Sequence, residues 1–253
     1  MMCRALNIAG VLSLVAAGSA HGQAWHAVMA AADSAYRHRD VPRALTGYRE
    51  VLASDSANYE ALWKASRAEV DLAEGASGRT MDSLLTAAQG HAEAAVREDP
   101  DLPDGHFSLA RALGRRALSV GTMDRIRFSK VVRAEALAAL KADSTHAGAL
   151  HVLGMWNAEI MRVNGFARAF AKTFLGAQVF GLASWGEAQR LLEESVRVDP
   201  GRIVHRLDLA GIYADRGETD KAREMYQWII DAPVIEPNDD LYKRQAADRL
   251  KRK

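Results

Sequence analysis

Cysteine and proline are scarce in this sequence. The chain has 253 residues with 6 prolines and 1 cysteine, Cys3, which lies close to the N-terminus. A folded part without cysteine cannot contain a disulfide, a thiolate nucleophile or a zinc–thiolate site. Few helix-breaking prolines, together with abundant Ala, Leu, Glu and Arg, favour α-helices. The composition therefore predicts an all-α protein.

A surplus of positive charge is also lacking. The chain carries 33 Lys and Arg residues against 32 Asp and Glu residues. Non-specific binding to nucleic acid depends on cations that displace counterions from phosphates. We therefore expect no nucleic-acid partner.

The first 22 residues differ from the rest of the chain. Arg4 precedes an apolar run from Ala5 to Ala17, and small residues follow up to Gly22. This order is typical of a secretory signal peptide, and the run is too short for a comfortable membrane span. We expect cleavage after Gly22, with cleavage after Ala20 or an uncleaved anchor as alternatives. The predicted location is periplasmic or secreted, with no transmembrane span and zero formal net charge once Arg4 is removed.

An internal repeat organises the remaining chain. Residues 203–236 contain, in the order of a tetratricopeptide repeat, Leu209, Ala210, Tyr213, Gly217, Ala222 and Tyr226. Leu209 and Tyr213 lie four apart on the inner face of a first helix. Gly217 permits the turn, and the small Ala222 lets a second helix approach closely.

The same frame divides the chain into five units and a cap. The predicted units are 25–58, 59–102, 103–146, 147–202 and 203–236, and 238–253 is a C-terminal capping helix. The second helix of the first four units closes at Asp55-Ser56, Asp99-Pro100, Asp143-Ser144 and Asp199-Pro200. The end units have the usual length of about 34 residues, whereas the middle three carry insertions. We predict one domain, 23–253: an all-α, tetratricopeptide-like superhelical array of about five helical hairpins.

Three segments resemble a known family. They read ALWKASRAEVDLAE at 61–74, HAEAAVREDPDLPDGHFSLA at 91–110, and HVLGMWNAEI at 151–160 followed by FLGAQVFGLASWGEAQRLLEESVRVDPG at 174–201. Together they are similar to the regulator of microtubule dynamics family, a tetratricopeptide-like group with bacterial relatives. The resemblance implies microtubule association in animal members and phospholipid binding in the membrane-contact members. Because an exported chain meets no microtubules, the binding of an apolar ligand is the more transferable of the two.

The concave face of such an array is the predicted binding groove. The residues expected there are Met29, Trp63, Arg67, Phe107, Arg111, Arg115, His151 and Met155. Apolar residues flanked by three arginines suit an apolar or amphipathic ligand with an anionic head, or an apolar protein segment. Alternatively, helices lengthened by the insertions fill the groove, and acids such as Glu69, Asp71 or Glu159 pair with the arginines.

The insertion of the fourth unit has a pattern of its own. Recurring every four residues are Phe166, Phe170 and Phe174. Arg168 and Lys172 project from the opposite side, so the segment is predicted to be an amphipathic helix. Three interpretations of this helix are open: a helix packed permanently on the array, a lid or pocket wall over an apolar site, and a membrane-surface helix. The expected ligand site lies between Trp63 and Met155, beneath these three phenylalanines.

Catalytic and metal-binding signatures are missing from the sequence. There is no Gly-rich phosphate loop, serine elbow or His-Glu-x-x-His motif, and the histidines are scattered. His151 has no evident partner with which to act as a general base. We expect no catalytic residue, metal or cofactor. The leading hypothesis is a non-enzymatic scaffold that holds a protein segment in the groove; a phospholipid or fatty-acid carrier is the alternative, and peripheral membrane contact is compatible with both.

Overall fold

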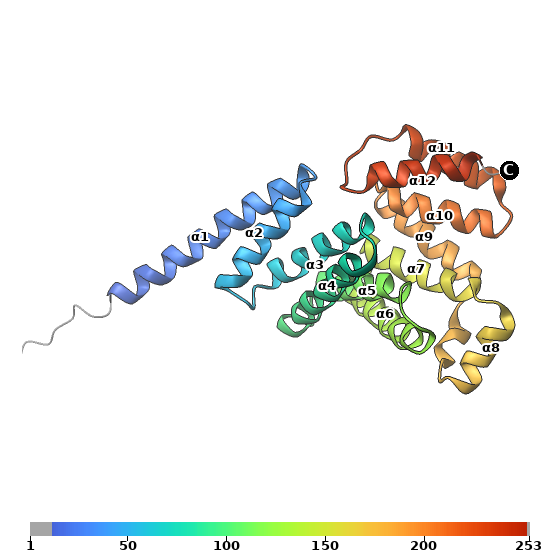
Figure 1. Cartoon of the computed structure of the whole chain (residues 1–253), viewed down its shortest axis with the longest axis horizontal. Helices are drawn as coiled ribbons and strands as arrows, with labels where there is room; N and C mark the ends of the chain where they lie inside the picture. Colours follow the sequence, from blue (N-terminus) through green and yellow to red (C-terminus); the bar gives the residue numbers. More distant parts are fainter. Residues whose placement is uncertain (1–11, 252–253) are drawn as a thin grey trace, which may run out of the picture.

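The computed structural model of the protein describes residues 12–251, without the side chains of residues 12–24 and of Phe174. Residues 1–11, which begin the predicted signal peptide, lie outside the described part, as do residues 252–253 of the predicted cap. The described residues form twelve α-helices and one 3-10 turn, and no strand (Figure 1). Within this part, no helix combines the length and apolarity that a bilayer span requires.

The helices pair into successive hairpins. The first three hairpins are α1 (Leu12–Arg37) with α2 (Val41–Ser54), α3 (Tyr59–Glu74) with α4 (Gly78–Glu98), and α5 (Pro103–Ala117) with α6 (Thr122–Ala142). The last two are α7 (Ala147–Arg162) with α9 (Trp185–Val198), and α10 (Ile203–Asp215) with α11 (Thr219–Asp231). Between α7 and α9 lie α8 (Gly165–Phe174) and the 3-10 turn η1 (Gln178–Leu182), and the chain closes with α12 (Asp239–Lys251). The predicted all-α tetratricopeptide-type array is confirmed.

The first helices of the hairpins form one continuous surface. Helix α3 packs on α5, α5 on α7, and α7 on α10. We call the surface made by α1, α3, α5, α7 and α10 the inner face; it corresponds to the predicted concave groove. Each second helix packs on its own first helix, so the array turns the same side of every hairpin toward the inner face.

Polar residues set the ends of the helices. Side-chain oxygens of Asp40, Asn58 and Ser184 accept hydrogen bonds from backbone N–H groups in the first turns of α2, α3 and α9. The C-caps of α2, α4, α6 and α9 are the four aspartates of the Asp-Ser and Asp-Pro pairs. These pairs therefore end the second helices as the sequence predicts.

The insertions lengthen second helices and add α8. Helices α4 and α6 have 21 residues each, against 14 in α2 and 13 in α11. The third insertion, with α8 and η1, separates α7 from α9 in the sequence, yet these two helices still pack as a hairpin. The added residues thus lie outside the row of first helices.

Close packing in the fourth hairpin depends on a glycine. Gly154 of α7 faces α9, and a Cβ at this position would lie 2.8 Å from Cγ of Leu192 and 3.3 Å from the carbonyl oxygen of Ala188. Leu192 is fully buried, so it has no free space into which to move. By contrast, a Cβ on Gly90 of α4 would meet nothing within 4 Å.

We therefore predict opposite effects for two glycine-to-alanine substitutions. Gly154→Ala overpacks the contact between α7 and α9 and should lower the free energy of unfolding by about 1–3 kcal/mol. Gly90→Ala should raise it by about 0.5–1 kcal/mol, because alanine costs less backbone entropy in a helix. Urea denaturation measures both, and equal effects of the two substitutions would contradict the packing described.

Candidate functional site

A buried carboxylate lies at the centre of the inner face. Asp71 of α3 accepts a hydrogen bond of 2.6 Å from the hydroxyl of Tyr36 and one of 2.7 Å from the guanidinium of Arg111. These donors come from α1 and α5, and Asp71 is only 7% exposed. A desolvated carboxylate needs donors of this kind, because an unpaired buried charge is very unfavourable.

The protonation states of this cluster are fixed by burial and by Asp71. Burial raises the pKa of the Tyr36 hydroxyl above its ordinary value, and the charge of Asp71 raises it further. Burial opposes the charged form of Arg111, but the charge of Asp71, the nearby Tyr242 and the hydrogen bond to Asp71 together raise the pKa of the guanidinium. Arg111 thus remains positively charged and forms an ion pair with Asp71.

The next turn of the inner face repeats the pairing. Arg115 donates to Glu74, whose side chain is 8% exposed. Burial raises the pKa of Glu74 even though Arg115 and Arg111 act in the opposite direction. Two of the three predicted groove arginines are therefore neutralised by carboxylates of α3.

Helix α12 covers this part of the inner face. The side-chain amide of Asn238, just before α12, donates to the carbonyl oxygen of Asp71 at 3.1 Å. Tyr242 is buried, and burial together with the charge of Glu74 raises the pKa of its hydroxyl. An ion pair of 3.6 Å joins Asp240 to Arg39 at the α1–α2 turn, toward which the start of α12 points in Figure 1. The pairing of Arg111 with Asp71 agrees with the alternative in which acids neutralise the groove arginines, and the cover over this pair comes from Asn238 and Tyr242 of the C-terminal segment.

Trp63 and Arg67 lie on the inner face beside Tyr36. The Cζ atom of Arg67 lies 3.7 Å from the ring centroid of Tyr36 and 5.1 Å from that of Trp63. Both Trp63 and Arg67 are half-buried. No carboxylate of the described residues pairs with Arg67, and its buried Nε atom has no hydrogen-bond acceptor there. This guanidinium is held by aromatic rings and not by an acid.

Several predicted groove residues serve the core. Met29 is 4% exposed and packs between α1, α2 and α3, so it does not line an open groove. Phe107 packs on Gly148 and lies beside the ring of His146, at a centroid distance of 4.7 Å. Met155 packs against the C-terminal core. These positions meet a neighbouring unit, and for that reason periodicity alone cannot separate them from groove positions.

Two histidines stack between α7 and α10. The rings of His151 and His205 lie 4.6 Å apart, and Nε2 of His151 is 2.8 Å from a carboxylate oxygen of Asp208. The buried Ser195 donates to the carbonyl of Ala147 at 2.8 Å and lies 2.9 Å from Nδ1 of His205. Because that hydroxyl proton is committed to a carbonyl, the arrangement holds helices together and does not activate a nucleophile. Among the described residues, no group of three or more His, Cys, Asp or Glu could hold a metal ion.

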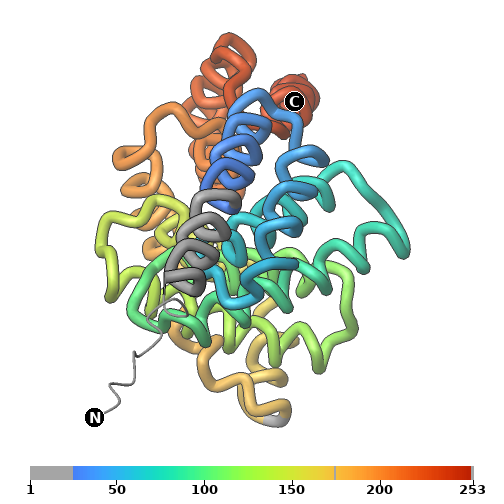
Figure 2. The backbone as a smooth tube through the Cα atoms, turned by 90° about the vertical axis from the view of Figure 1, so that its left-hand side faces the viewer, coloured from blue at the N-terminus to red at the C-terminus, as the bar shows by residue number. Residues whose placement is uncertain are grey.

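Helix α8 does not lie over the inner face. Phe166 is 85% exposed and Phe170 is 48% exposed, whereas Ala171 is buried against residues of α5, α6 and α7. Figures 1 and 2 both place α12 at the top of the molecule and α8 at the bottom. The predicted site beneath the phenylalanines is therefore wrong, and the side chain of Phe174 lies outside the described residues.

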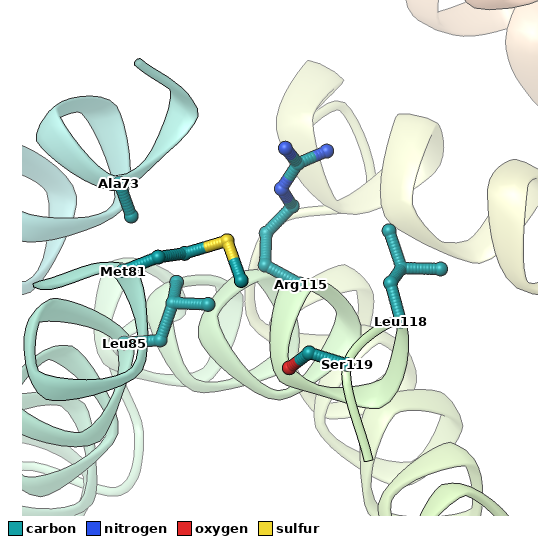
Figure 3. Close-up of a pocket in the computed structure, with 6 residues that line it drawn as sticks. All are labelled: Ala73, Met81, Leu85, Arg115, Leu118 and Ser119. Atoms are coloured by element: carbon teal, nitrogen blue, oxygen red, sulfur yellow. The ribbon is translucent and has the colours of Figure 1, made fainter. Parts of the chain in front are cut away.

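A small pocket lies beside Arg115. Its volume is about 120 Å³, and it is lined by Ala73, Met81, Leu85, Arg115, Leu118 and Ser119 (Figure 3). In Figure 3 the Arg115 side chain rises between Met81 and Leu118, with its guanidinium turned away from the apolar floor. Small-molecule sites commonly measure about 300–1,000 Å³, so this pocket holds little more than solvent.

Comparison with known proteins agrees with this architecture. The sequence model described as regulator of microtubule dynamics protein 1-3 matches residues 28–253. A crystal structure of a thermophilic TPR protein of Thermus thermophilus is 17% identical, with a TM-score of 0.65 over 89% of this chain and 98% of that chain. YrrB, a TPR protein with an unusual peptide-binding site, is 18% identical, with a TM-score of 0.42 over 87% of this chain and 90% of that one. No curated protein matches by sequence. The Thermus likeness supports the fold.

We predict that removal of the central carboxylate is strongly destabilising. Asp71→Ala leaves Arg111 and the hydroxyl of Tyr36 without their buried partner and should cost about 3–5 kcal/mol of unfolding free energy. Asp124→Ala is the control, since it breaks a surface pair with Arg127 at 3.0 Å and should change stability by less than about 1 kcal/mol. Thermal and urea unfolding give both values, and similar losses would refute the central role of Asp71.

We also predict that His205 makes stability fall in mild acid. Burial lowers its pKa well below 6.5 in the folded state, with His151 adding to the effect. Below about pH 6.5 the imidazole of His205 binds a proton in the unfolded chain but not in the folded chain. The free energy of unfolding therefore falls by up to about 1.4 kcal/mol for each pH unit of acidification. His205→Asn retains a donor toward Ser195 without titrating, and its stability should depend less on pH between about 6.5 and 5. Parallel stability curves for the two proteins would rule this out.

Proposed function

The chain belongs to the regulator of microtubule dynamics protein 1-3 family. We propose that it is a non-enzymatic scaffold of the cell envelope. It holds a segment of a partner protein on the part of the inner face that carries Trp63 and Arg67. The observation that carries the proposal is the guanidinium of Arg67, which stacks on Tyr36 without a carboxylate partner among the described residues.

The chemistry of Arg67 favours a partner that has a carboxylate beside an apolar side chain. Stacking fixes the plane of the guanidinium, so little further entropy is lost when its N–H groups meet a planar acid. Trp63 supplies apolar area next to that charge, as aromatic anchors do at protein interfaces. Arg111 and Arg115 offer no such opportunity, because Asp71 and Glu74 already neutralise them.

The position of α12 supports binding of a segment on this face. The C-terminal segment of the chain itself lies on the part of the inner face around Asp71, where Asn238 donates to the Asp71 carbonyl and Tyr242 is buried. Toward α1 and α3 the same face carries Trp63 and Arg67 in place of the paired acids and arginines. A partner segment therefore needs only the half that α12 leaves accessible.

The envelope location rests on the N-terminal sequence. Arg4, the apolar run Ala5 to Ala17 and the small residues up to Gly22 follow the order of a signal peptide. Trp25 is the first residue of α1 whose side chain the structure describes. Cleavage after Gly22 therefore removes none of the described side chains. The inner face is thus unchanged by the proposed processing.

A carrier of phospholipid or fatty acid is less well supported. Two of the three arginines expected to meet an anionic head are already neutralised by acids. Catalysis has equally little support, since the hydroxyl of Ser195 donates to a carbonyl. Binding of a protein segment uses what remains available, namely Trp63 and Arg67.

Partner capture with matched variants tests the proposal. Immobilised wild-type protein incubated with envelope extract should retain a partner, and Arg67→Ala and Trp63→Ala should each weaken its binding by roughly 30-fold, as at an interface hot spot. Arg67→Lys should give only partial rescue, because lysine keeps the charge but loses the planar stacked fork. The binding constant is measured by calorimetry with the partner identified from the wild-type capture.

Controls separate loss of the site from loss of the fold. Arg190→Ala breaks only a surface pair of α9 with Glu187, at 2.6 Å, and should leave capture unchanged. Thermal unfolding of each variant checks that the array remains folded. Two results would overturn the proposal. One is partner binding that neither Arg67→Ala nor Trp63→Ala weakens; the other is a native mass spectrum of the purified protein that shows bound lipid in place of a protein partner.

A further inference from the structure

The insertion between α7 and α9 exposes an unusual amount of apolar surface. We call residues 163–182, which contain α8 and η1, the insertion tip. Phe166 is 85% exposed and Leu182 is 60% exposed, and Val163 and Phe170 also present apolar surface. Exposed phenyl and leucyl groups are unfavourable in water, so a cluster of them indicates a surface that meets something else.

The same tip carries cations without acids. No Asp or Glu lies between Glu159 and Glu187. Arg168 donates only to the backbone oxygens of Ile160 and Met161 and to the sulfur of Met161. Lys172 is exposed, and no carboxylate of the described residues forms an ion pair with it. Although the chain as a whole is almost neutral, the tip is locally positive.

The tip is held firmly enough to present these groups. Asn164 caps α8 by accepting from the backbone N–H of Ala167 at 2.8 Å. Ala171, Ala177 and Phe180 are buried in the core that includes Trp156. The side chain of Lys172 lies beside Gly181 of η1, with its Nζ nearest to the position that a Cβ of this glycine would take. The insertion tip thus carries exposed apolar groups together with an exposed cation.

We propose that the insertion tip docks on the surface of a bilayer that contains anionic phospholipids. Interfacial helices combine large apolar side chains with Lys or Arg, so that the rings enter the acyl boundary while the cations meet phosphates. Protein interfaces are depleted of lysine and need a broader buried area than a few separated side chains provide. This charge complementarity favours a membrane over a protein partner. The proposal is independent of the inner face.

Vesicle flotation tests the docking surface directly. The probes are vesicles of phosphatidylcholine alone and of phosphatidylcholine mixed equally with phosphatidylglycerol. Wild-type protein should partition about tenfold more strongly to the anionic vesicles at low salt, and high salt should remove most of that difference. Phe166→Ser should weaken binding to the anionic vesicles by roughly 10- to 100-fold. Lys172→Gln should weaken it by about fivefold and leave neutral vesicles unaffected.

A matched control uses an exposed apolar residue elsewhere. Met123, at the start of α6, is 61% exposed, and Met123→Ser should leave partitioning unchanged. All proteins have the same length, so any contribution of the apolar N-terminal segment is common to them. Phe166 is so exposed that its replacement should not alter the thermal unfolding curve. Absence of vesicle binding, equal binding to both compositions, or equal binding by wild type and Phe166→Ser would each refute the proposal.

Discussion

The rest of the structure depends on the buried charge of Asp71. Its carboxylate accepts from Tyr36 of α1 and Arg111 of α5, and its backbone oxygen accepts from Asn238 before α12. A charge removed from water is tolerated only where several donors converge on it. Because these donors come from separate parts of the chain, the Asp71 carboxylate links the first three hairpins, and the backbone oxygen of the same residue holds the C-terminal segment beside them.

That constraint divides the inner face into two halves with different chemistry. Where Arg111 and Arg115 meet Asp71 and Glu74, charge is internally balanced and α12 covers the surface. On the other side, the rings of Tyr36 and Trp63 hold Arg67 in place of a carboxylate. Tyr36 belongs to both halves, since its hydroxyl bonds to Asp71 while its ring supports Arg67. The proposed partner site is thus built on the same interaction that closes the other half.

The sequence predicted the array because a hairpin repeat leaves repeated local signals. Asp-Pro and Asp-Ser pairs end helices by local backbone chemistry, and Leu209 and Tyr213 mark an inner helix face by spacing alone. Docking of α12 left no such signal, since only Asp239, Tyr242 and Ala246 of that helix are buried. Periodicity also predicted α8 correctly, but it could not show that the small Ala171 packs inward while Phe166 faces outward. Which side of an amphipathic helix is buried depends on the neighbours it meets.

The two proposed surfaces are compatible because of where the array places them. Helix α12 lies at the top of the molecule and α8 at the bottom in both views (Figures 1 and 2). A bilayer in contact with the insertion tip therefore does not compete with α12 for the inner face. The near balance of charge over the whole chain, 33 cations against 32 anions, means that attraction to phosphates must act locally at the tip. Local attraction of that kind orients the molecule, and it leaves Arg67 available to a partner segment in water.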